Sequence, residues 1–292
     1  MMQASSWVFV NGCWVPSDEA AVSVFDHGFL YGDGVFETLR ASRGQILWCD
    51  RHVARLSRSC EKLHLSVPIA HEAWVALLEE LLTRNRLSEA LVRITVSRGI
   101  GDLGVDPSLC PKPTVVVMGR PLPSYPTDFK ERGVRLAVAG IRRTGVGTQL
   151  PDIKSLSFQT NVLAKHEAVQ AGAFDAVMLN ADDCVTECTT SNLFFIDNGV
   201  LHTPAQECGL IPGITRDLVI ELAAEAGLAV QQGCYPLSTV LGAQEWFLTN
   251  TGMGIMPIRQ IGQSRNDTCP GPLTRYLQAV FEAKIAECIG SR

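Results

Sequence analysis

The chain has 292 residues, of which 46% are hydrophobic and 19% are charged, and its formal net charge is -5. This length is sufficient for two lobes, and the composition is that of a globular protein rather than a disordered one. The sequence contains no lysine-rich run or basic stripe, which argues against nucleic-acid binding, and its longest apolar runs are too short to span a bilayer.

The ten cysteines are scattered, without a C-x-x-C pair or a cluster of histidines. Structural zinc sites usually show closely spaced ligand pairs, so no metal site is expected. The first ten residues lack the basic head and long apolar run of a signal peptide. We therefore expect the cysteines to be mostly buried thiols in a reducing cytoplasm. They are Cys13, Cys49, Cys60, Cys110, Cys184, Cys188, Cys208, Cys234, Cys269 and Cys288.

The first part of the chain is predicted to alternate between strands and helices. Residues 7–15 are predicted to form a hairpin, because Asn11-Gly12 tolerates the positive φ of a tight turn and is flanked by apolar residues. A helix is expected to begin with Asp50 as its N-cap. The other elements predicted in this part are a strand near Val35, an amphipathic helix over 71–87 and strands over 91–97 and 114–118.

Two prolines and a serine within residues 121–125 indicate a linker between two lobes. After it, a second hairpin is predicted around Asn198-Gly199, and a helix over 213–227 ends at a glycine. The remaining predicted elements are strands over 134–139, 176–179 and 245–250 and helices over 161–171 and 273–289. Together they predict an α+β or mixed α/β fold, with an N-terminal lobe (1–121), a linker (122–133) and a C-terminal lobe (134–292).

Lys154 is the first residue with a chemical signature. It lies in a largely uncharged stretch, residues 150–156. A lysine among apolar groups is poised for a lowered pKa and for forming an imine with a carbonyl. The local sequence is equally compatible with an exposed loop lysine.

Two further features accompany this lysine. Residues 213–215 lead into a helix, whose free N–H groups and threonine hydroxyl would bind an anion, although a plain capped helix remains an alternative. Glu187 stands among small polar residues, where it is either a partner for a protonated ring nitrogen or a solvated turn carboxylate. An amine, an anion cradle and a ring-nitrogen partner together fit pyridoxal phosphate, whereas the nicotinamide motif G-x-G-x-x-G and the P-loop are absent from the sequence.

Along nearly its whole length the chain resembles the class IV aminotransferases, which are the fold-type IV pyridoxal-phosphate enzymes. The resemblance is carried by five ordered motifs. They are residues 25–40 (FDHGFLYGDGVFETLR), 51–56 (RHVARL), 152–156 (DIKSL) with 161–165 (NVLAK), 186–187 (TE) with 191–194 (SNLF), and 212–216 (PGITR).

The resemblance implies a small N-terminal lobe, a larger C-terminal lobe with the cofactor between them, and a homodimer in which loops of the partner reach the substrate pocket. Lys154 matches the lysine that carries the cofactor and moves a proton at the substrate Cα, and Glu187 matches the partner of the pyridine nitrogen. The other implied cofactor contacts are Arg55, Ile214, Thr215 and Thr251 to the phosphate and Ile211 to the ring, and the implied substrate residues are Tyr31, Phe36, Thr38, Arg40 and Arg93.

Two positions depart from the family pattern. Many members carry a tyrosine shortly after the lysine, where this sequence has Phe158, so the usual contact to the cofactor phenolate oxygen is in doubt. The residue after the glutamate is often glycine, and here it is Cys188.

Three activities share these motifs. Residues 36–40 and 249–257 resemble aminodeoxychorismate lyases, which release pyruvate and 4-aminobenzoate, whereas 152–156 and Ser191-Asn192 resemble D-amino-acid aminotransferases. The loop 99–106 is more similar to that of branched-chain enzymes, and Phe36 favours an apolar substrate. We therefore favour a branched-chain-type aminotransferase that passes the amino group to 2-oxoglutarate by a ping-pong mechanism. The lyase and the D-specific transaminase remain alternatives. A catalytically inactive scaffold would not need to retain Lys154, Glu187 and Arg55 together.

Overall fold

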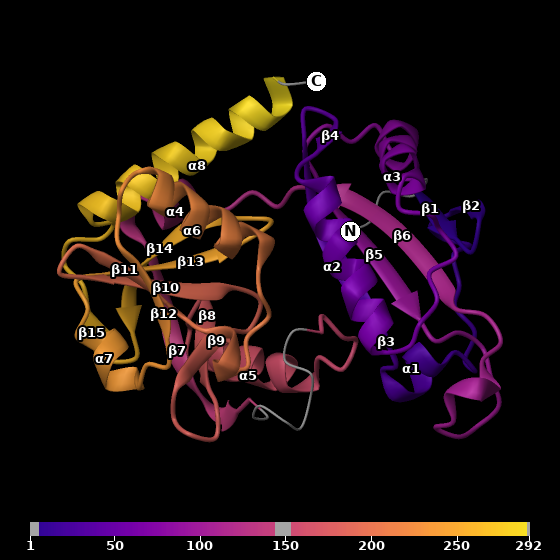
Figure 1. The fold of residues 1–292 in the computed structure, drawn as a ribbon, viewed down its shortest axis with the longest axis horizontal. Coiled ribbons are helices and arrows are strands. Elements are labelled where there is room, and N and C mark those ends of the chain that lie inside the picture. Colours follow the sequence, from indigo (N-terminus) through magenta and orange to yellow (C-terminus); the bar gives the residue numbers. More distant parts are fainter. Residues whose placement is uncertain (1–5, 144–152, 291–292) are drawn as a thin grey trace. The chain divides into compact units, whose positions relative to one another are not determined.

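The computed structural model describes residues 6–143 and 153–290. The described residues form two compact units (Figure 1): unit 1 combines residues 6–123 with 153–157 and 288–290, and unit 2 combines 124–143 with 158–287. The mixed α/β class predicted from the sequence is confirmed. The grouping differs from the expected lobes in two places. Residues expected as linker form helix α4 (Thr127–Arg132) within unit 2, and the segment with Lys154 belongs to unit 1.

Unit 1 is built on an antiparallel sheet of six strands in the order β2-β1-β6-β5-β3-β4. The predicted hairpin at its start is confirmed, with Asn11 and Gly12 at φ of 49° and 93°. The strands are β1 (Trp7–Val10), β2 (Cys13–Pro16), β3 (Gly34–Ser42), β4 (Gln45–Ile46), β5 (Ala90–Ser97) and β6 (Thr114–Pro121). The helices are α1 (His27–Tyr31), α2 (Cys49–Lys62), α3 (Ala73–Arg84) and the 3-10 turn η1 (Pro107–Leu109).

The two faces of this sheet differ in chemistry. On β5, alternate residues such as Val92 and Ile94 are fully buried, and they share one core with Leu56 of α2 and Leu78 of α3. Both helices therefore cover the same face of the sheet, and α2 lies along β3 and β5 in Figure 1. The alternation places the intervening side chains of β3 and β5 on the opposite face.

The start of α2 corrects one prediction. The helix begins at Cys49 after Trp48, which has a φ of 49° and makes no side-chain capping bond, so Asp50 is not the N-cap. Asp50 lies instead in the first turn, where a carboxylate still interacts favourably with the helix dipole. The aromatic side chain of Trp48 gave no signal of a helix start.

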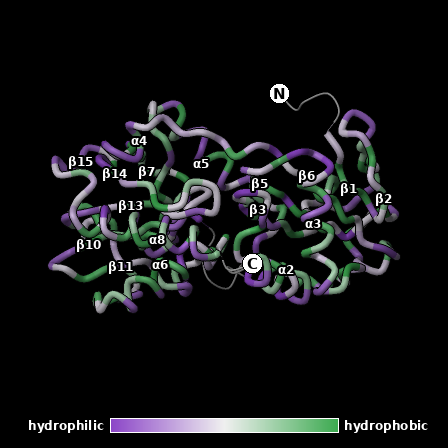
Figure 2. Tube along the Cα trace, turned by 90° about the horizontal axis from the view of Figure 1, so that it is seen from above, coloured by the Kyte–Doolittle hydropathy of each residue, from purple (hydrophilic) through white to green (hydrophobic). Residues whose placement is uncertain are grey.

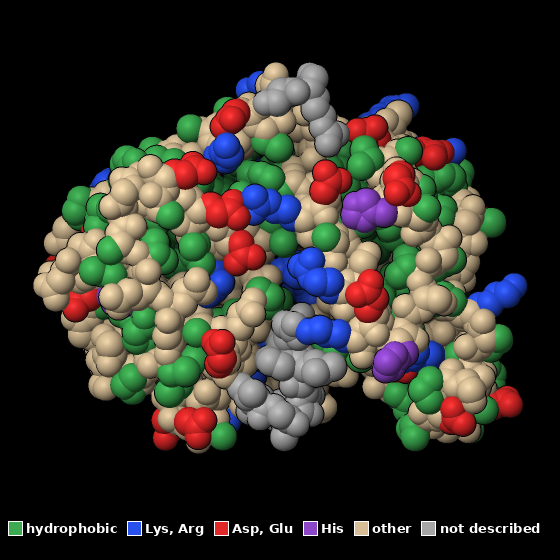
Figure 3. All heavy atoms as spheres, viewed as in Figure 1, with side chains coloured by type: hydrophobic (Ala, Val, Ile, Leu, Met, Phe, Trp, Pro, Cys, Tyr) green, Lys and Arg blue, Asp and Glu red, His purple; other side chains and the backbone are tan. Residues whose placement is uncertain are grey.

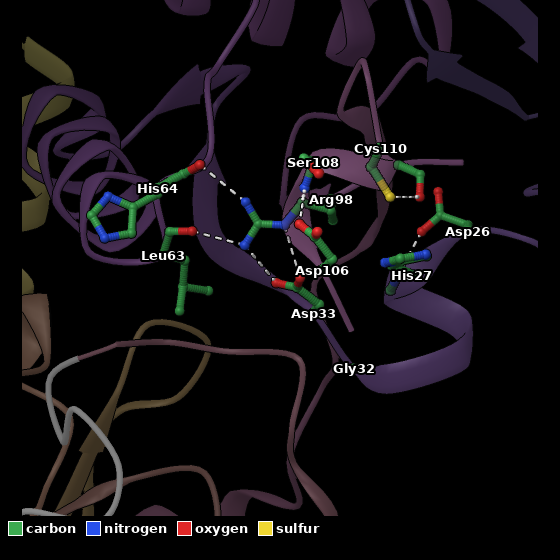
Figure 4. A network of polar contacts seen from close by, with 12 residues as sticks. Asp26, His27, Gly32, Asp33, Leu63, His64, Arg98, Asp106, Ser108 and Cys110 are labelled. Carbon is green, nitrogen blue, oxygen red and sulfur yellow. Dashed lines mark hydrogen bonds and ion pairs between the residues drawn. The ribbon is translucent and has the colours of Figure 1, made fainter. Parts of the chain in front are cut away.

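An arginine fixes the other end of α2 (Figure 4). Arg98 Nε and Nη2 donate to the two carboxylate oxygens of Asp33 at 2.8 and 3.1 Å. The same guanidinium donates to the backbone oxygens of Leu63 and His64 at 2.8 and 3.0 Å, where α2 ends. These bonds satisfy helix C-terminal carbonyls and tie α2 to the ends of two strands, which positions the inner side chains of the helix.

Unit 2 contains a mixed sheet of nine strands, β12-β11-β10-β13-β14-β7-β8-β9, with β15 beside β14. The hairpin predicted around Asn198-Gly199 is confirmed as β10 and β11. The strands are β7 (Val134–Arg142), β8 (Asp175–Leu179), β9 (Val185–Cys188), β10 (Asn192–Asp197), β11 (Val200–Pro204), β12 (Val230–Gly233), β13 (Glu245–Asn250), β14 (Gly254–Ile261) and β15 (Ser264–Arg265). The other elements are α5 (Gln159–Gln170), η2 (Gln206–Cys208), α6 (Ile214–Glu225), α7 (Leu237–Leu241) and α8 (Pro272–Gly290).

Hydrophobic residues concentrate along the strands and hydrophilic ones in the connections (Figure 2). The face in Figure 3 carries acidic and basic side chains intermixed. Within the described ranges, none of the helices is long and apolar enough to cross a membrane. The described residues also include no group of three or more His, Cys, Asp or Glu side chains suited to a metal ion.

Candidate active site

Lys154 lies on a short extended segment that pairs with the start of β3. The Lys154 carbonyl accepts a hydrogen bond from Phe36 N at 2.9 Å, and Leu156 N donates to Gly34 O at 2.8 Å. Ile153 is buried in the core of unit 1. This register fixes the backbone on both sides of the lysine, whose side chain is half-buried rather than exposed as in a surface loop. Asp152 of the same motif lies outside the described residues.

The Lys154 amine lies beside an aromatic ring that also contacts an arginine. Lys154 Nζ is 4.4 Å from the centroid of the Phe36 ring, and Arg93 Cζ is 3.8 Å from it. Burial lowers the pKa of Arg93 from its usual value. Thr38 pairs with Arg93 in the sheet, so it shares this face. The structure thus brings together an amine, an apolar ring and a guanidinium.

Arg40 and Tyr31 were also predicted to contact substrate. Arg40 lies on the same face of β3 as Phe36, and its buried Nε has no hydrogen-bond partner among the described residues. Tyr31 lies at the end of α1, where its hydroxyl accepts a hydrogen bond from Gly104 N at 3.0 Å. The visible role of Tyr31 is therefore to hold the loop 99–106, and its contact with substrate stays a prediction.

Behind this face, toward α2, lies a buried cluster of Glu37, His52 and Arg55. Arg55 donates from Nε and Nη2 to the Glu37 carboxylate at 2.7 and 2.9 Å, and His52 Nδ1 lies 2.9 Å from Glu37 Oε2. Burial raises the pKa of Glu37, but the Arg55 charge and the hydrogen bonds more than offset it, so the pKa falls well below 4.5. Burial lowers the pKa of His52, so the imidazole is neutral and donates a hydrogen bond rather than forming an ion pair.

We expect Glu37→Gln to lower the free energy of unfolding by about 3–5 kcal/mol at pH 7, because it removes the carboxylate charge that pairs with the buried Arg55 guanidinium. A carboxyl group whose pKa is lower in the folded state than in the unfolded state stabilises the fold at pH values above the unfolded-state pKa. This stabilisation is lost progressively as the pH falls below about 4.5. The difference in the free energy of unfolding between wild type and Glu37→Gln should therefore become smaller as the pH falls from 4.5 to 3. Urea unfolding at pH 7, 4 and 3 measures it.

The matched control is Glu80→Gln, which breaks the exposed pair with Arg84 on α3. Exposed pairs contribute about 0–1 kcal/mol, so this variant should resemble wild type at every pH. Two results would contradict the stabilising role of the buried Glu37–Arg55 pair. One is an equal loss of unfolding free energy in the two variants, and the other is a loss in Glu37→Gln that grows as the pH falls.

Glu187 lies within strand β9 and is 4% exposed, so it is not a solvated turn carboxylate. Arg143 Nη1 donates to its Oε1. Its Oε2 accepts hydrogen bonds from Asn192 Nδ2 and Ile211 N, each at 3.1 Å. A buried, acceptor-only carboxylate that attracts a cationic N–H donor is the group that a protonated pyridine nitrogen needs.

Asn192 reaches Glu187 only because residue 213 is glycine. Asn192 Nδ2 also donates to Ile211 O at 2.9 Å, so the amide joins the carboxylate to the loop before α6. A Cβ on Gly213 would lie 2.1 Å from Asn192 Oδ1. Gly213 has a φ of -75°, so this glycine is required by close approach and not by backbone conformation.

We therefore expect Gly213→Ala to destabilise unit 2 by about 1–3 kcal/mol, because the asparagine must leave its position. Thermal or urea unfolding checks this value. Gly242→Ala is the control, since its Cβ would meet its nearest neighbour at 3.6 Å. If the two alanine variants are equally stable, the close approach of Asn192 is not a constraint. Asn192→Ala should make Gly213→Ala tolerated.

The N-terminus of α6 carries the predicted phosphate contacts Ile214 and Thr215. Its N-cap is Gly213, which offers no side chain to cap the first N–H groups, and both following residues are buried. Such a helix start is suited to an anion. Thr251 lies in the turn after β13. Nearby in register, Thr249 pairs with Asn192, and its buried Oγ1 has no hydrogen-bond partner among the described residues.

The predicted residues are divided between the units. Unit 1 holds Lys154, Arg55 and the predicted substrate residues, and unit 2 holds Glu187, Ile211, Ile214, Thr215 and Thr251. Sequence reasoning missed the supporting residues Glu37, His52, Arg143, Asn192 and Thr249. One of them carried a usable signal, because His52 lies three residues before the predicted site residue Arg55 on a predicted helix and so shares a face with it.

Comparisons with known proteins find relatives along nearly the whole chain. A family model described as amino-transferase class IV matches residues 34–261. The chain is 39% identical over 276 residues to a protein of Methanocaldococcus jannaschii provisionally named branched-chain-amino-acid aminotransferase, covering 94% of this chain and 95% of that one. It is 31% identical over 284 residues to the aminodeoxychorismate lyase of Bacillus subtilis, with 97% and 96% covered. D-alanine aminotransferases of Listeria are also among the relatives.

Solved structures give the same answer for the fold. The branched-chain amino acid aminotransferase of Escherichia coli is 26% identical, with a TM-score of 0.92 over 96% of this chain and 94% of that one. Another solved branched-chain amino acid aminotransferase, from T.th. and holding pyridoxamine 5'-phosphate, is 29% identical, with a TM-score of 0.91 over 99% and 95% of the two chains. The mixed α/β fold of the chain is therefore that of these solved structures.

Proposed function

The chain belongs to the class IV aminotransferase family and is a pyridoxal-phosphate-dependent transaminase, and we propose that it takes the amino group from a branched-chain amino acid and passes it to 2-oxoglutarate. The observation that carries the substrate proposal is the Phe36 ring, which contacts both Lys154 Nζ and the Arg93 guanidinium. The ring offers an apolar surface to an aliphatic side chain. The guanidinium offers a partner to the second carboxylate of 2-oxoglutarate, so one face serves both substrates.

The residues present fit the cofactor. Glu187 is a buried acceptor that already holds a cationic N–H donor, and the start of α6 is open to an anion. The Thr249 hydroxyl, which lacks a partner among the described residues, lies beside Asn192. We propose that Lys154 holds the cofactor covalently, that Glu187 binds its ring nitrogen, and that Arg55, Ile214, Thr215 and Thr251 bind its phosphate, with Ile211 packed on the ring. When bound, pyridoxal phosphate supplies an electron sink for charge at the substrate Cα.

The remaining chemistry belongs to the protein. The Lys154 amine would take the proton from the substrate Cα and return it to the cofactor carbon that Lys154 had held, which is general acid–base catalysis by a positioned group. The β3 pairing on both sides of Lys154 holds that amine at the Phe36 ring. Arg40, whose Nε has no partner within the described ranges, is proposed to bind a substrate oxygen.

The test is a titration of the cofactor-loaded protein with L-leucine, L-glutamate, D-alanine and 4-amino-4-deoxychorismate in separate reactions. Absorbance of the bound cofactor is followed, and products are identified by mass spectrometry. Keto acids from L-leucine and L-glutamate, with recovery of the absorbance on adding 2-oxoglutarate, support the proposal. Turnover of D-alanine alone, or pyruvate and 4-aminobenzoate from aminodeoxychorismate, would replace it with the D-specific transaminase or the lyase.

We also propose a homodimer. Unit 1 exposes an apolar set on α1, the segment before it and the loop 99–106, and α5 exposes a second one. These residues are Val22, Val24, Phe25, Phe29, Ile100, Leu103 and Val105 in unit 1 and Val162, Leu163 and Val169 on α5. Clusters of exposed apolar side chains are typical of a protein interface. Light scattering that returns the mass of one chain would contradict it.

The ten free cysteines support a cytoplasmic location.

A further inference from the structure

Two cysteines of unit 2, neither of them within the motifs discussed above, meet at the edge of its sheet. The sulfur atoms of Cys208 and Cys234 lie 3.1 Å apart, and Cys208 Sγ is 3.6 Å from Gly233 O. Cys208 ends the turn η2 and is fully buried, whereas Cys234 follows β12 and is exposed. Neither thiol takes part in the proposed transamination.

The contact is built by the sheet and not by chance proximity of two loops. Strands β11 and β12 pair in parallel from Leu201 and Val230 to Pro204 and Gly233, so the chain leaves both strands at the same edge. Ala205 N donates to Gly233 O at 3.0 Å, which continues the pairing for one more residue. The two cysteines therefore face each other although they are 26 positions apart in the sequence.

We propose that Cys208 and Cys234 form a redox-active dithiol, which a low-molecular-weight disulfide such as glutathione disulfide converts reversibly into a protein disulfide. In the first step the Cys234 thiolate attacks glutathione disulfide, forming a mixed disulfide and releasing one glutathione thiolate. In the second step Cys208, whose proton passes to water, attacks the Cys234 sulfur and displaces the second glutathione. Two protein thiols are oxidised, and one glutathione disulfide is reduced to two glutathione molecules.

Exposure sets the order of these steps. Cys234 meets solvent and so reacts first with a dissolved disulfide. Burial, together with the neighbouring Cys234, raises the pKa of Cys208 to about 12, which protects that thiol from reagents in solution. Once the mixed disulfide has formed, the adjacent sulfur of Cys234 is an electrophile within reach of Cys208. Cys208 is thus the resolving thiol and Cys234 the attacking one.

Closure of this disulfide would act on the loop that follows Cys208. That loop carries Ile211, whose N–H donates to Glu187, and Gly213, which begins α6. The Cys208 carbonyl is already held by Asn180 Nδ2 at 3.3 Å. A cross-link to Cys234 encloses the loop and the whole of α6 in one covalent ring, and it constrains the unfolded chain. The oxidised protein is therefore expected to unfold at a higher urea concentration than the reduced protein.

The experiment incubates the holoenzyme in buffers of increasing glutathione disulfide content and quenches it with a thiol-blocking reagent. Intact mass and a peptide map are then recorded. Wild type should lose two hydrogens and yield a linked peptide containing Cys208 and Cys234. Cys208→Ser should keep one glutathione on Cys234, because the resolving thiol is missing. Cys234→Ser cannot form the protein disulfide, and its remaining thiol, Cys208, should react with glutathione disulfide at least about tenfold more slowly than the wild-type pair does.

Cys184→Ser is the matched control, because Cys184 lies close enough to raise the pKa of Cys208 further but is not in the sulfur contact. It should behave as wild type. A linkage between Cys184 and Cys234, or a persistent glutathione on Cys234 in the wild type, would overturn the proposal, as would failure to form the disulfide at any glutathione ratio. These readouts require no substrate, so they stand or fall separately from the transaminase assignment.

Discussion

Replacing Lys154 with alanine is expected to lower the rate of transamination by at least about 1,000-fold, because the variant would lose both the proposed covalent anchor of the cofactor and the proposed proton carrier. The measurement has two parts. Steady-state formation of keto acid reports the rate. Borohydride reduction followed by intact mass reports the attachment, since wild type should retain the cofactor after denaturation and Lys154→Ala should not.

Folding of the variant separates the chemistry from the structure. The backbone bonds that hold this segment to β3 are made by Lys154 O and Leu156 N, and alanine retains both. Lys154→Ala should therefore unfold near the wild-type urea midpoint. Lys130→Ala, which removes an exposed lysine paired with Glu282 at 3.2 Å, should keep full activity and full attachment. Activity in Lys154→Ala, or cofactor still bound covalently to it, would remove the lysine from its proposed role.

The sequence located Lys154 but not its surroundings. Periodicity predicted β5 and the inward residues of α2, because buried strands and amphipathic helices leave regular apolar patterns. Residue 154 lies in an extended segment that pairs with a strand more than 100 residues earlier, and pairing of that kind has no local signature. For the same reason the segment was expected in the C-terminal lobe, whereas it belongs to unit 1.

Glu187 shows a second limit of sequence reading. Its neighbours are small and polar, which is typical of a turn, yet β9 is buried along its whole length. Burial is tolerated because β9 pairs with β8 and because the polar groups bond to one another, as Thr186 Oγ1 does to Met178 O at 3.0 Å. Hydrophobic pattern cannot predict a strand whose buried side chains are satisfied by hydrogen bonds. The motif resemblance identified the residue, and the structure supplied its partners Arg143 and Asn192.

Glu187→Gln is expected to reduce kcat by at least about 100-fold while changing KM much less, because the carboxylate is proposed to support charge that develops during the reaction and not the binding of substrate. The glutamine amide is a donor on one side, whereas Glu187 is surrounded by the donors of Arg143, Asn192 and Ile211. In the variant, the glutamine NH2 group would face one of these hydrogen-bond donors. The side chain would also lack the negative charge that favours a protonated ring nitrogen.

The absorbance of the bound cofactor makes this prediction specific to the ring nitrogen. If Glu187 keeps that nitrogen protonated, the band of Glu187→Gln should shift relative to wild type before any substrate is added, and Glu187→Asp, which keeps the charge, should restore part of the rate. Glu225→Gln, at the exposed end of α6, is the control and should leave the absorbance band and the reaction rate unchanged. A slow Glu187→Gln enzyme with an unshifted band would mean that the carboxylate acts only by holding Asn192 and the loop at Ile211, and its contact with the cofactor would then have to be abandoned.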